Sequence, residues 1–386
     1  MSRPLVVHIS GDFPDAVQPR KTRAVAALVE GTADAFEHRV YSLNRVGRTA
    51  LPGAIEKVAD DGHVASWTYA GPPAGLFLAT AMRRVADAIL DDIARRGIRP
   101  ALVQGHKLTI EGLAARRVAQ ALGVPYVLSL QGNTDQKILG VRRDLAGRYA
   151  RVFRGAARVF PFSPWIADWA AARLGSPAHP PILLPCVPVR DTVLAPVATP
   201  PRVVSAFHLD HWKLKNAATL AAAAASVARR VPELALEIAG DGAPAAREGV
   251  DALLAGGPGR RIGHVAAEAI QPWMNGAAVF AMPSLRESFG MVFVEALLSG
   301  CPIVYPAGRA VAGYFDGAPF ALAVPPRDTG AVAAAIATLI EDQDRRKAAL
   351  AHWQADGGAA RFRRDAILAC YREGVRAALI DARNIS

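Results

Sequence analysis

Hydrophobic positions along the chain form short continuous runs that alternate with longer segments in which they recur at helical spacing. The short runs predict strands, and the longer segments predict helices. This alternation favours parallel sheets that helices cover on both faces. In the N-terminal half, the predicted strands are residues 5–10, 38–43, 101–104, 126–130, 159–162 and 182–184. The predicted helices there are residues 21–35, 82–94, 110–122, 142–156 and 164–173.

A second alternating set follows the proline-bearing stretch 191–201, which predicts an interdomain linker. The predicted strands of this set are residues 202–206, 235–239, 278–282 and 303–305. Its predicted helices are residues 217–230, a helix that begins near Met291, residues 330–340 and residues 359–382. We therefore expect an α/β chain with two doubly wound, Rossmann-like domains. The length of 386 residues fits this number, because domains usually hold ~100–200 residues.

Composition marks a globular chain and excludes several classes of protein. The hydrophobic fraction is 52%, but the longest alanine-rich run, residues 217–228, is shorter than the ~20 residues of a bilayer span. The apolar run at residues 4–9 is too short for the core of a signal peptide, so we expect a cytoplasmic protein. The three cysteines, Cys186, Cys301 and Cys370, are far apart and odd in number, which fits neither a zinc knuckle nor a disulfide framework.

The net charge of +11 lies mainly in the N-terminal half, where residues 1–195 hold 25 of the 45 Lys and Arg but 16 of the 34 Asp and Glu. The predicted helix 142–156 is basic and amphipathic. Two interpretations stay open: a solvated arginine face, or a surface that docks on anionic lipid with residues 76–78 as a second shallow anchor. No zinc-finger, RNA-recognition or helix-turn-helix signature accompanies the charge, so nucleic acid is not an expected partner.

The most informative stretch runs from Pro283 to Gly300, where two carboxylates eight positions apart bracket a Ser-Phe-Gly turn. On one helix these side chains would point ~80° apart, so a loop that holds Glu287 and a helix that holds Glu295 fit the spacing better. The free amides at the start of such a helix form an anion site. Glu287 would then bind the hydroxyl groups of a sugar, and Glu295 would bind those of a ribose. The free amides would bind the diphosphate between them. The alternative is an ordinary loop and helix with two solvated glutamates.

This segment resembles the Glu-x7-Glu motif of the retaining glycosyltransferases of family 4, which have the GT-B fold. Pro-Ser before Glu287, Phe-Gly after it, and Glu-Ala-Leu-x-x-Gly-x-Pro up to Pro302 all match. The resemblance implies that Glu287 contacts the donor sugar and that Glu295 holds the ribose. It also implies a role in donor binding for the residues between them, namely Ser288, Phe289, Gly290, Met291 and Val292. By the same resemblance, residues 1–190 form the acceptor-side domain, 191–201 the linker and 202–358 the donor domain, and the helix 359–386 returns to the first domain.

Loops that follow other predicted strands extend the resemblance, because ligands of doubly wound sheets bind beyond the carboxyl ends of strands. Lys215 matches a lysine that grips the diphosphate, and Lys213 is the alternative. The arginine that usually accompanies it is absent, which leaves part of the stabilisation to His208 or helix amides. The Gly240-Asp241-Gly242 turn matches a structural turn of the family, and the remaining matched donor-site positions are Gly263 and His264, near the base.

The N-terminal half matches the family more loosely. Gln131 stands where the family has a histidine that contacts the donor sugar; glutamine can exchange hydrogen bonds there but cannot titrate. His106 matches another position on the acceptor side. Arg20 and Lys21, at a predicted helix start, are candidates for holding a phosphate or an anionic acceptor.

We therefore expect a retaining glycosyltransferase that moves a sugar from a nucleoside diphosphate sugar to an acceptor, which is a sugar, a lipid-linked molecule or a cell-envelope glycan. The implied mechanism is front-face attack assisted by the departing diphosphate, with no metal and no cofactor. Two alternatives stay open. One is a nucleotide-sugar epimerase or an inverting transferase on the same fold, and the other is a non-catalytic binding subunit. Cytoplasmic location with peripheral association at the membrane is expected.

Overall fold

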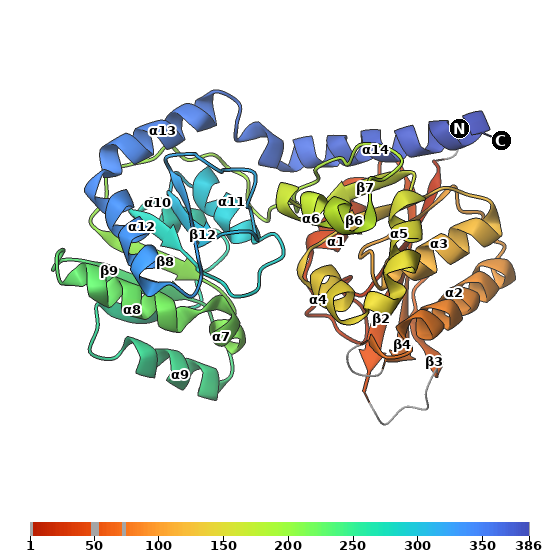
Figure 1. Cartoon of the computed structure of the whole chain (residues 1–386), viewed down its shortest axis with the longest axis horizontal. Coiled ribbons are helices and arrows are strands. Elements are labelled where there is room, and N and C mark those ends of the chain that lie inside the picture. Colours follow the sequence, from red (N-terminus) through yellow and green to blue (C-terminus); the bar gives the residue numbers. More distant parts are fainter. Residues whose placement is uncertain (1–2, 48–53, 72–74, 386) are drawn as a thin grey trace. The chain divides into compact units, whose positions relative to one another are not determined.

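The computed structural model describes residues 3–47, 54–71 and 75–385 (Figure 1). The chain divides into two compact units. Unit 1 comprises the residues up to Phe162, Ile166–Val187 and the residues from Ile367 on, and unit 2 comprises Ser163–Trp165 and Pro188–Ala366. Each unit is an α/β layer structure built on its own sheet, so the predicted fold class is confirmed.

In the described part of unit 1, seven strands form a sheet in the order β3-β4-β2-β1-β5-β6-β7. All neighbouring pairs are parallel except β3 and β4. The strands are β1 (Leu5–Ser10), β2 (Glu37–Val46), β3 (Ile55–Asp60), β4 (Val64–Ala70), β5 (Leu102–Gly105), β6 (Tyr126–Leu130) and β7 (Arg158–Pro161). The helices are α1 (Ala24–Gly31), α2 (Leu78–Arg95), α3 (Glu111–Leu122), α4 (Asn133–Val141), α5 (Ala146–Arg154) and α6 (Pro164–Leu174).

Some predictions for unit 1 differ from the structure. The predicted strand 182–184 is no strand, although its backbone runs beside β7, with the N–H of Ile182 donating to Val159 O at 3.0 Å. The predicted helix 142–156 is a 3-10 turn, Arg143–Leu145, followed by the shorter α5. The edge hairpin of β3 and β4 was not predicted, because β3 exposes polar residues and lacks an apolar run.

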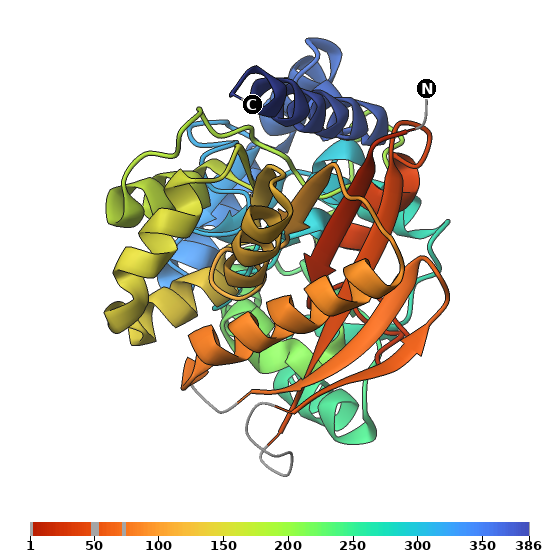
Figure 2. The same cartoon turned by 90° about the vertical axis from the view of Figure 1, so that its right-hand side faces the viewer.

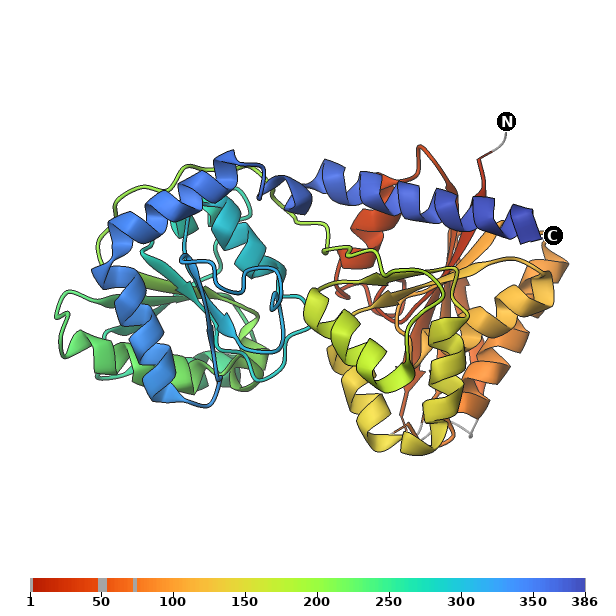
Figure 3. The ribbon, with the colours of Figure 1, turned by 45° about the horizontal axis from the view of Figure 1, so that its top comes forward.

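Unit 2, all of whose residues are described, has a parallel six-stranded sheet in the order β10-β9-β8-β11-β12-β13. The strands are β8 (Arg202–Ala206), β9 (Ala235–Ala239), β10 (Gly259–Gly263), β11 (Val279–Ala281), β12 (Ile303–Pro306) and β13 (Ala321–Val324). The helices are α7 (Trp212–Lys215), α8 (Ala217–Ala228), α9 (Pro244–Leu254), α10 (Ile270–Asn275), α11 (Met291–Leu298), α12 (Thr329–Glu341) and α13 (Gln343–Ala355). Figure 3 shows helices on both faces of this sheet.

The last helix, α14 (Arg364–Ile385), belongs to unit 1 from Ile367 on. Its residues Tyr371 and Val375 are fully buried in the same core cluster as Val6 of β1 and Phe160 of β7. The Tyr371 hydroxyl donates a hydrogen bond to the side chain of Gln104 on β5. Figure 2 shows α14 lying across one end of the unit 1 strands. Residues that are far apart in the sequence therefore complete one core.

Candidate active site

The carboxyl edge of the unit 2 sheet gathers the loops that carry the predicted donor residues. Strand β11 lies between β8 and β12, so the loops after these three strands are neighbours. The loop after β11 ends at Gly290, where α11 begins. Gly290 has φ +74°, and an added Cβ would lie 2.7 Å from the ring of Phe293. Glycine is therefore required for the tight turn that directs the free amides of α11 back to the loop.

A lysine and a glutamate from two of these loops form an ion pair. Lys215 Nζ lies 2.5 Å from Glu287 Oε2, and both side chains are mostly buried. Lys213 takes a different direction, with its ammonium 5.2 Å from the centre of the Trp212 ring. The geometry thus brings Lys215, rather than Lys213, to the first glutamate of the motif.

Asn216, which sequence reasoning did not select, holds three of the unit 2 loops together. It has φ +61°, an uncommon conformation for a residue other than glycine. Its Nδ2 donates to Pro283 O at 3.1 Å, on the loop after β11, and also to Pro326 O, beyond β13. Its Oδ1 accepts from Thr219 Oγ1 at 2.9 Å. Because Asn216 follows Lys215 directly, these bonds place the lysine. Its position between Lys215 and the start of α8 is the feature of the sequence that could have identified Asn216.

Glu295 lies on α11, one turn inside the helix. Burial raises the pKa of its carboxyl group, and a backbone hydrogen bond with Val189 partly opposes that shift. The carboxyl group is thus held in a poorly solvated place on the helix whose N-terminus faces the motif loop. A group of this kind gains more from two ribose hydroxyls than a solvated carboxylate would.

The predicted base-side and phosphate-side residues of unit 2 lie on loops that support one another. Gly240 has φ +140°, and a Cβ there would lie 1.9 Å from Phe207 O, so the loops after β8 and β9 approach too closely for another residue. His208 is exposed, and its Nδ1 accepts a hydrogen bond from Asp210 N at 3.4 Å. Gly263 O accepts from Gly240 N at 2.7 Å, and the following His264 is exposed.

The carboxyl edge of the unit 1 sheet holds a buried charge cluster. Lys107 Nζ lies 2.6 Å from Asp12 Oδ2 and 3.5 Å from Glu111 Oε1. Burial alone would lower the pKa of Lys107, but Glu111 and Asp12 raise it above its usual value. Burial raises the pKa of Glu111, and among the described residues its Oε2 has no hydrogen-bond partner. Gln131 bonds to the Asp12 side chain and so joins this cluster.

Sequence reasoning selected Gln131 and His106 at this edge but missed Asp12, Lys107 and Glu111. Lys107 and Glu111 are four positions apart and follow a predicted strand directly. This spacing predicts an ion pair at the carboxyl edge of the sheet. Asp12 gives no comparable signal, because its partner is 95 positions away in the sequence.

His106 is the end of a chain of three imidazoles that crosses neighbouring strands. His106 Nε2 lies 3.0 Å from His8 Nδ1, and His8 Nε2 lies 2.9 Å from His38 Nδ1. His38 Nε2 then lies 3.2 Å from Thr32 Oγ1, which itself donates to Leu28 O at 2.8 Å. Because the Thr32 proton is used on Leu28, each imidazole must donate from Nε2 and accept at Nδ1.

Burial keeps these imidazoles neutral. It lowers the pKa of His8 well below its usual range, that of His38 to about 4 and that of His106 to about 3. The order of donors along the chain leaves the Nδ1 of His106 as a hydrogen-bond acceptor. A hydroxyl group is the kind of ligand that such a nitrogen accepts from.

The remaining predicted acceptor-side residues lie in the first loop of unit 1. Lys21 Nζ lies 3.2 Å from Asp15 Oδ2 and 3.0 Å from Ser42 Oγ, with its side chain almost fully buried. The Lys21 ammonium is therefore used in hydrogen bonds and an ion pair that stabilise this part of unit 1. Arg20 is exposed. Helix α1 begins at Ala24, so neither residue lies at the helix start as predicted.

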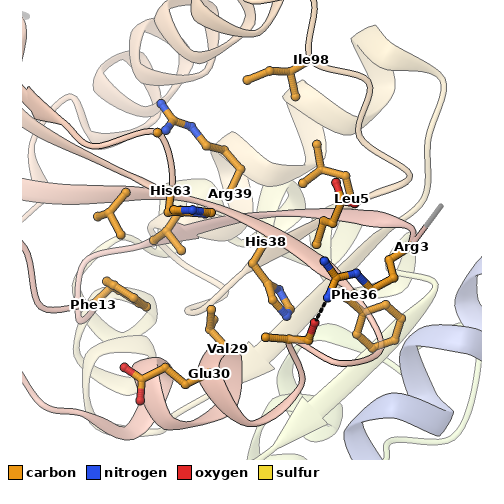
Figure 4. A pocket seen from close by; sticks show the side chains of 15 residues that line it. Arg3, Leu5, Phe13, Val29, Glu30, Phe36, His38, Arg39, His63 and Ile98 are labelled. Atoms are coloured by element: carbon orange, nitrogen blue, oxygen red, sulfur yellow. Dashed lines mark hydrogen bonds between the residues drawn. The ribbon is translucent and has the colours of Figure 1, made fainter.

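Unit 1 also has a pocket of about 550 Å³ that holds none of the predicted site residues (Figure 4). Phe13, Val29 and Phe36 contribute apolar surface, and His38 extends from β2 toward it. Arg3 donates to Ala33 O at its rim. The pocket reaches the imidazole chain at His38, whose two nitrogens are already used by His8 and Thr32.

Metal and membrane features are absent from the described residues. In residues 3–47, 54–71 and 75–385, no group of three or more His, Cys, Asp and Glu side chains is arranged to hold a metal ion. Across the same residues, no helix combines the length and the apolar character that crossing a membrane requires.

Comparisons with known proteins agree with this architecture. Residues 21–186 match the family described as glycosyl transferase 4-like domain, and residues 200–342 match the family described as glycosyl transferases group 1. No curated protein matches the chain in sequence.

Solved structures match over nearly the whole length. Sucrose-phosphate synthase from Thermosynechococcus elongatus is 22% identical with a TM-score of 0.60, covering 92% of this chain and 96% of that one. Anabaena HepE, solved with UDP and glucose, is 16% identical with a TM-score of 0.63, covering 97% and 100%. A glycosyltransferase from Rickettsia africae is 12% identical with a TM-score of 0.65, covering 98% of each chain. With two glycosyltransferase domains and this fold, the chain is a glycosyltransferase of the GT-B superfamily.

Proposed function

We propose that the chain is a retaining, family-4-like hexosyltransferase that uses a nucleoside diphosphate sugar without a metal. The observation that carries this proposal is the Lys215–Glu287 ion pair beside the N-terminus of α11, with Glu295 one turn inside that helix. Glu287 suits the hydroxyl groups of a sugar, Lys215 and the free amides suit a diphosphate, and Glu295 suits a ribose.

Each part of the site would have one task. Glu287 holds hydroxyl groups of the donor sugar, while Lys215 and the first amides of α11 stabilise the charge that develops on the leaving diphosphate. Glu295 binds the ribose, and Gly263 and His264 lie where the base binds. The leaving phosphate takes the proton from the acceptor hydroxyl that attacks from the same face, so the configuration at the anomeric carbon is kept.

The acceptor would bind at the carboxyl edge of unit 1. The supporting observation is the buried cluster around Asp12 and Lys107, with His106 beside it as a neutral hydrogen-bond acceptor. A sugar or a lipid-linked glycan presents hydroxyl groups to such a cluster. Gln131, bonded to Asp12, would contact the donor sugar without taking part in proton transfer.

A peripheral membrane association of unit 1 is part of the proposal. Five arginines line a hollow of about 390 Å³ between α2, α3 and α5, namely Arg83, Arg116, Arg117, Arg148 and Arg151. Arg117 pairs with Asp87, and within the described residues the other four have no ion pair with a carboxylate. Leu76 and Phe77, before α2, are 53% and 63% exposed. Arg158, at the start of β7, pairs with Asp381 at 2.7 Å and does not line this hollow.

Vesicle binding tests this association. We expect co-sedimentation with anionic vesicles at low salt and release at high salt, because the Debye length falls from ~10 Å at 0.1 M to ~3 Å at 1 M. Replacing Arg148 and Arg151 with serine should weaken binding. Replacing Arg229 and Arg230, which are exposed in unit 2, makes the same change in charge and should not. Binding that is equal in both double variants would refute the docking surface.

The main experiment is calorimetry with UDP, GDP, ADP and TDP sugars, followed by NMR of the product anomer. UDP comes first, because the similar Anabaena protein was solved with UDP and glucose. Retention at the anomeric carbon is the expected outcome. An inverted product, or a changed sugar without transfer to an acceptor, would select the inverting transferase or the epimerase. Donor binding without turnover on any acceptor would select the binding subunit.

A further inference from the structure

The loop after β12 places an arginine against the motif loop from the side opposite to Lys215. β12 and β8 flank β11 on its two sides, so their loops flank the loop that holds Glu287. Arg309 Nη1 donates a hydrogen bond to Leu285 O, two residues before Glu287. The N–H of Leu285 in turn donates to Leu214 O at 2.8 Å, next to Lys215. Leu285 thus links the two basic loops.

The backbone beside Arg309 is held in one conformation. Ala310 has φ +57°, which alanine rarely adopts without external support. Its carbonyl oxygen accepts two hydrogen bonds, from Ser163 Oγ at 2.7 Å and from Trp165 Nε1 at 2.9 Å. The guanidinium therefore extends from a rigid support, which lowers the entropic cost of binding a ligand.

The way in which Arg309 is anchored leaves its phosphate-binding edge unused. In a guanidinium group, Nε–H and one Nη–H lie side by side and match two oxygens of a phosphate. Nη1 is the nitrogen bound to Leu285 O, so the edge made by Nε and Nη2 remains. Nε is buried, and in the described structure it has no hydrogen-bond partner. An unpaired buried donor is costly, and a phosphate oxygen would remove that cost.

The net charge of the site indicates that a further cation is needed to bind a diphosphate. The Lys215 ammonium already faces the Glu287 carboxylate at 2.5 Å, so the pair adds no net charge. A diphosphate carries several negative charges, and the partial charge of one helix N-terminus does not balance them. Resting on the proposed function, we propose that Arg309 is a phosphate-binding residue of the donor site, in which its Nε and Nη2 hold the diphosphate of the nucleotide.

The test measures UDP, UMP and inorganic pyrophosphate binding by calorimetry for the wild type and Arg309→Gln. Glutamine keeps a donor for Leu285 O but removes the charge. We expect UDP binding to weaken by about 10- to 100-fold, the range for a charged hydrogen bond, and UMP binding to change much less. The control is Arg230→Gln, an exposed arginine beyond the C-terminal end of α8, the end away from Lys215, which should leave both affinities unchanged.

Arg309→Lys distinguishes a role in phosphate binding from a purely structural role. It keeps the positive charge but loses the pair of N–H donors that can bind two phosphate oxygens. Its UDP affinity should lie between those of the wild type and Arg309→Gln, with unchanged thermal unfolding. Equal losses for UDP and UMP, or UDP affinity unaffected in Arg309→Gln, would overturn the assignment and leave the proposed function standing. If pyrophosphate bound in a way that depends on Arg309 but no nucleotide bound, Arg309 would be a phosphate-binding residue and the proposal that the ligand is a nucleotide would be refuted. A wild type that binds neither pyrophosphate nor any of UDP, GDP, ADP and TDP would refute both the phosphate site and the proposed function.

Discussion

The carboxyl edges of the two sheets differ in how their charged side chains are paired. In unit 2 one lysine, at the end of α7, meets one glutamate on the loop after β11, and both side chains are mostly buried. In unit 1 one buried lysine meets two carboxylates, of which Glu111 is fully buried and Asp12 is partly exposed, and three neutral imidazoles continue the polar network into the sheet. Burial costs each of these charges its hydration, so the unit 1 cluster is held by mutual pairing. A single ion pair can be separated by a bound ligand, whereas the linked groups of unit 1 hold one another in place.

Removing the central cation of unit 1 should have the largest effect. Lys107→Met leaves the buried Glu111 and the partly exposed Asp12 without a counter-charge, and we expect a loss of about 3–5 kcal/mol in unfolding free energy, measured by urea denaturation. Adding Glu111→Gln to this variant should restore part of the loss, since one buried charge is then removed. A Lys107→Met variant as stable as the wild type would show that the cluster is solvated.

Lys215→Ala should lower turnover by ~10²-fold or more, because it removes a cation where the leaving group gains charge. It should lower the unfolding free energy less than Lys107→Met does, because it leaves one carboxylate rather than two without a counter-charge. Lys213→Ala serves as the matched control. If Lys213→Ala were severe and Lys215→Ala silent, the diphosphate would belong to the other lysine.

Acid should weaken unit 1 before unit 2. The pKa values of His8, His38 and His106 are lower in the folded chain than the usual 6.5. The unfolded chain therefore binds protons first, and stability is present above pH 6.5 and is lost as the pH falls toward 4. For His106 alone the loss is about 2 kcal/mol by pH 5. Hydrogen exchange at pH 7.5 and 5, corrected for intrinsic rates, should show faster opening in β1, β2 and β5. Equal changes in β8 and β9 would contradict this difference.

Glu295→Gln should separate binding from stability within unit 2. The carboxyl group has a raised pKa because burial penalises its charge, so glutamine should keep or slightly raise the unfolding temperature at neutral pH. Nucleotide affinity should fall about 10-fold, because the ribose loses a charged hydrogen-bond acceptor. Binding of the wild type should likewise weaken as the pH falls through the raised pKa. A lower unfolding temperature with unchanged affinity would make Glu295 a structural residue.

Gln131→Ala should have the smallest effect, a loss of several-fold in kcat/KM for one hydrogen bond. Because glutamine does not titrate, the pH dependence of the rate should keep its shape. Loss of an ionisation from that profile would instead connect Gln131 to the state of Asp12, its partner.

Sequence reasoning worked where the information is local. β1, β6, β8 and β9 were predicted with their observed bounds, because each is an apolar run ended by turn residues. The motif loop and α11 were likewise visible, since Gly290 and both glutamates lie within nine positions. Asp12, Lys107 and the imidazole chain could not be predicted, because they depend on which strands become neighbours. Arg309 was missed for the same reason: its role depends on β12 lying beside β11.

The place of α14 in the unit 1 core has a consequence for the order in which the protein is made. Tyr371 and Val375 leave the ribosome only after residues 188–366, which form the bulk of unit 2. Domains generally fold as units during synthesis, the first-made one first. Here the first-made unit lacks part of its core until the end, so unit 2 can be complete while unit 1 still exposes the surface around Phe160. A nascent chain would then depend on chaperones for its older half.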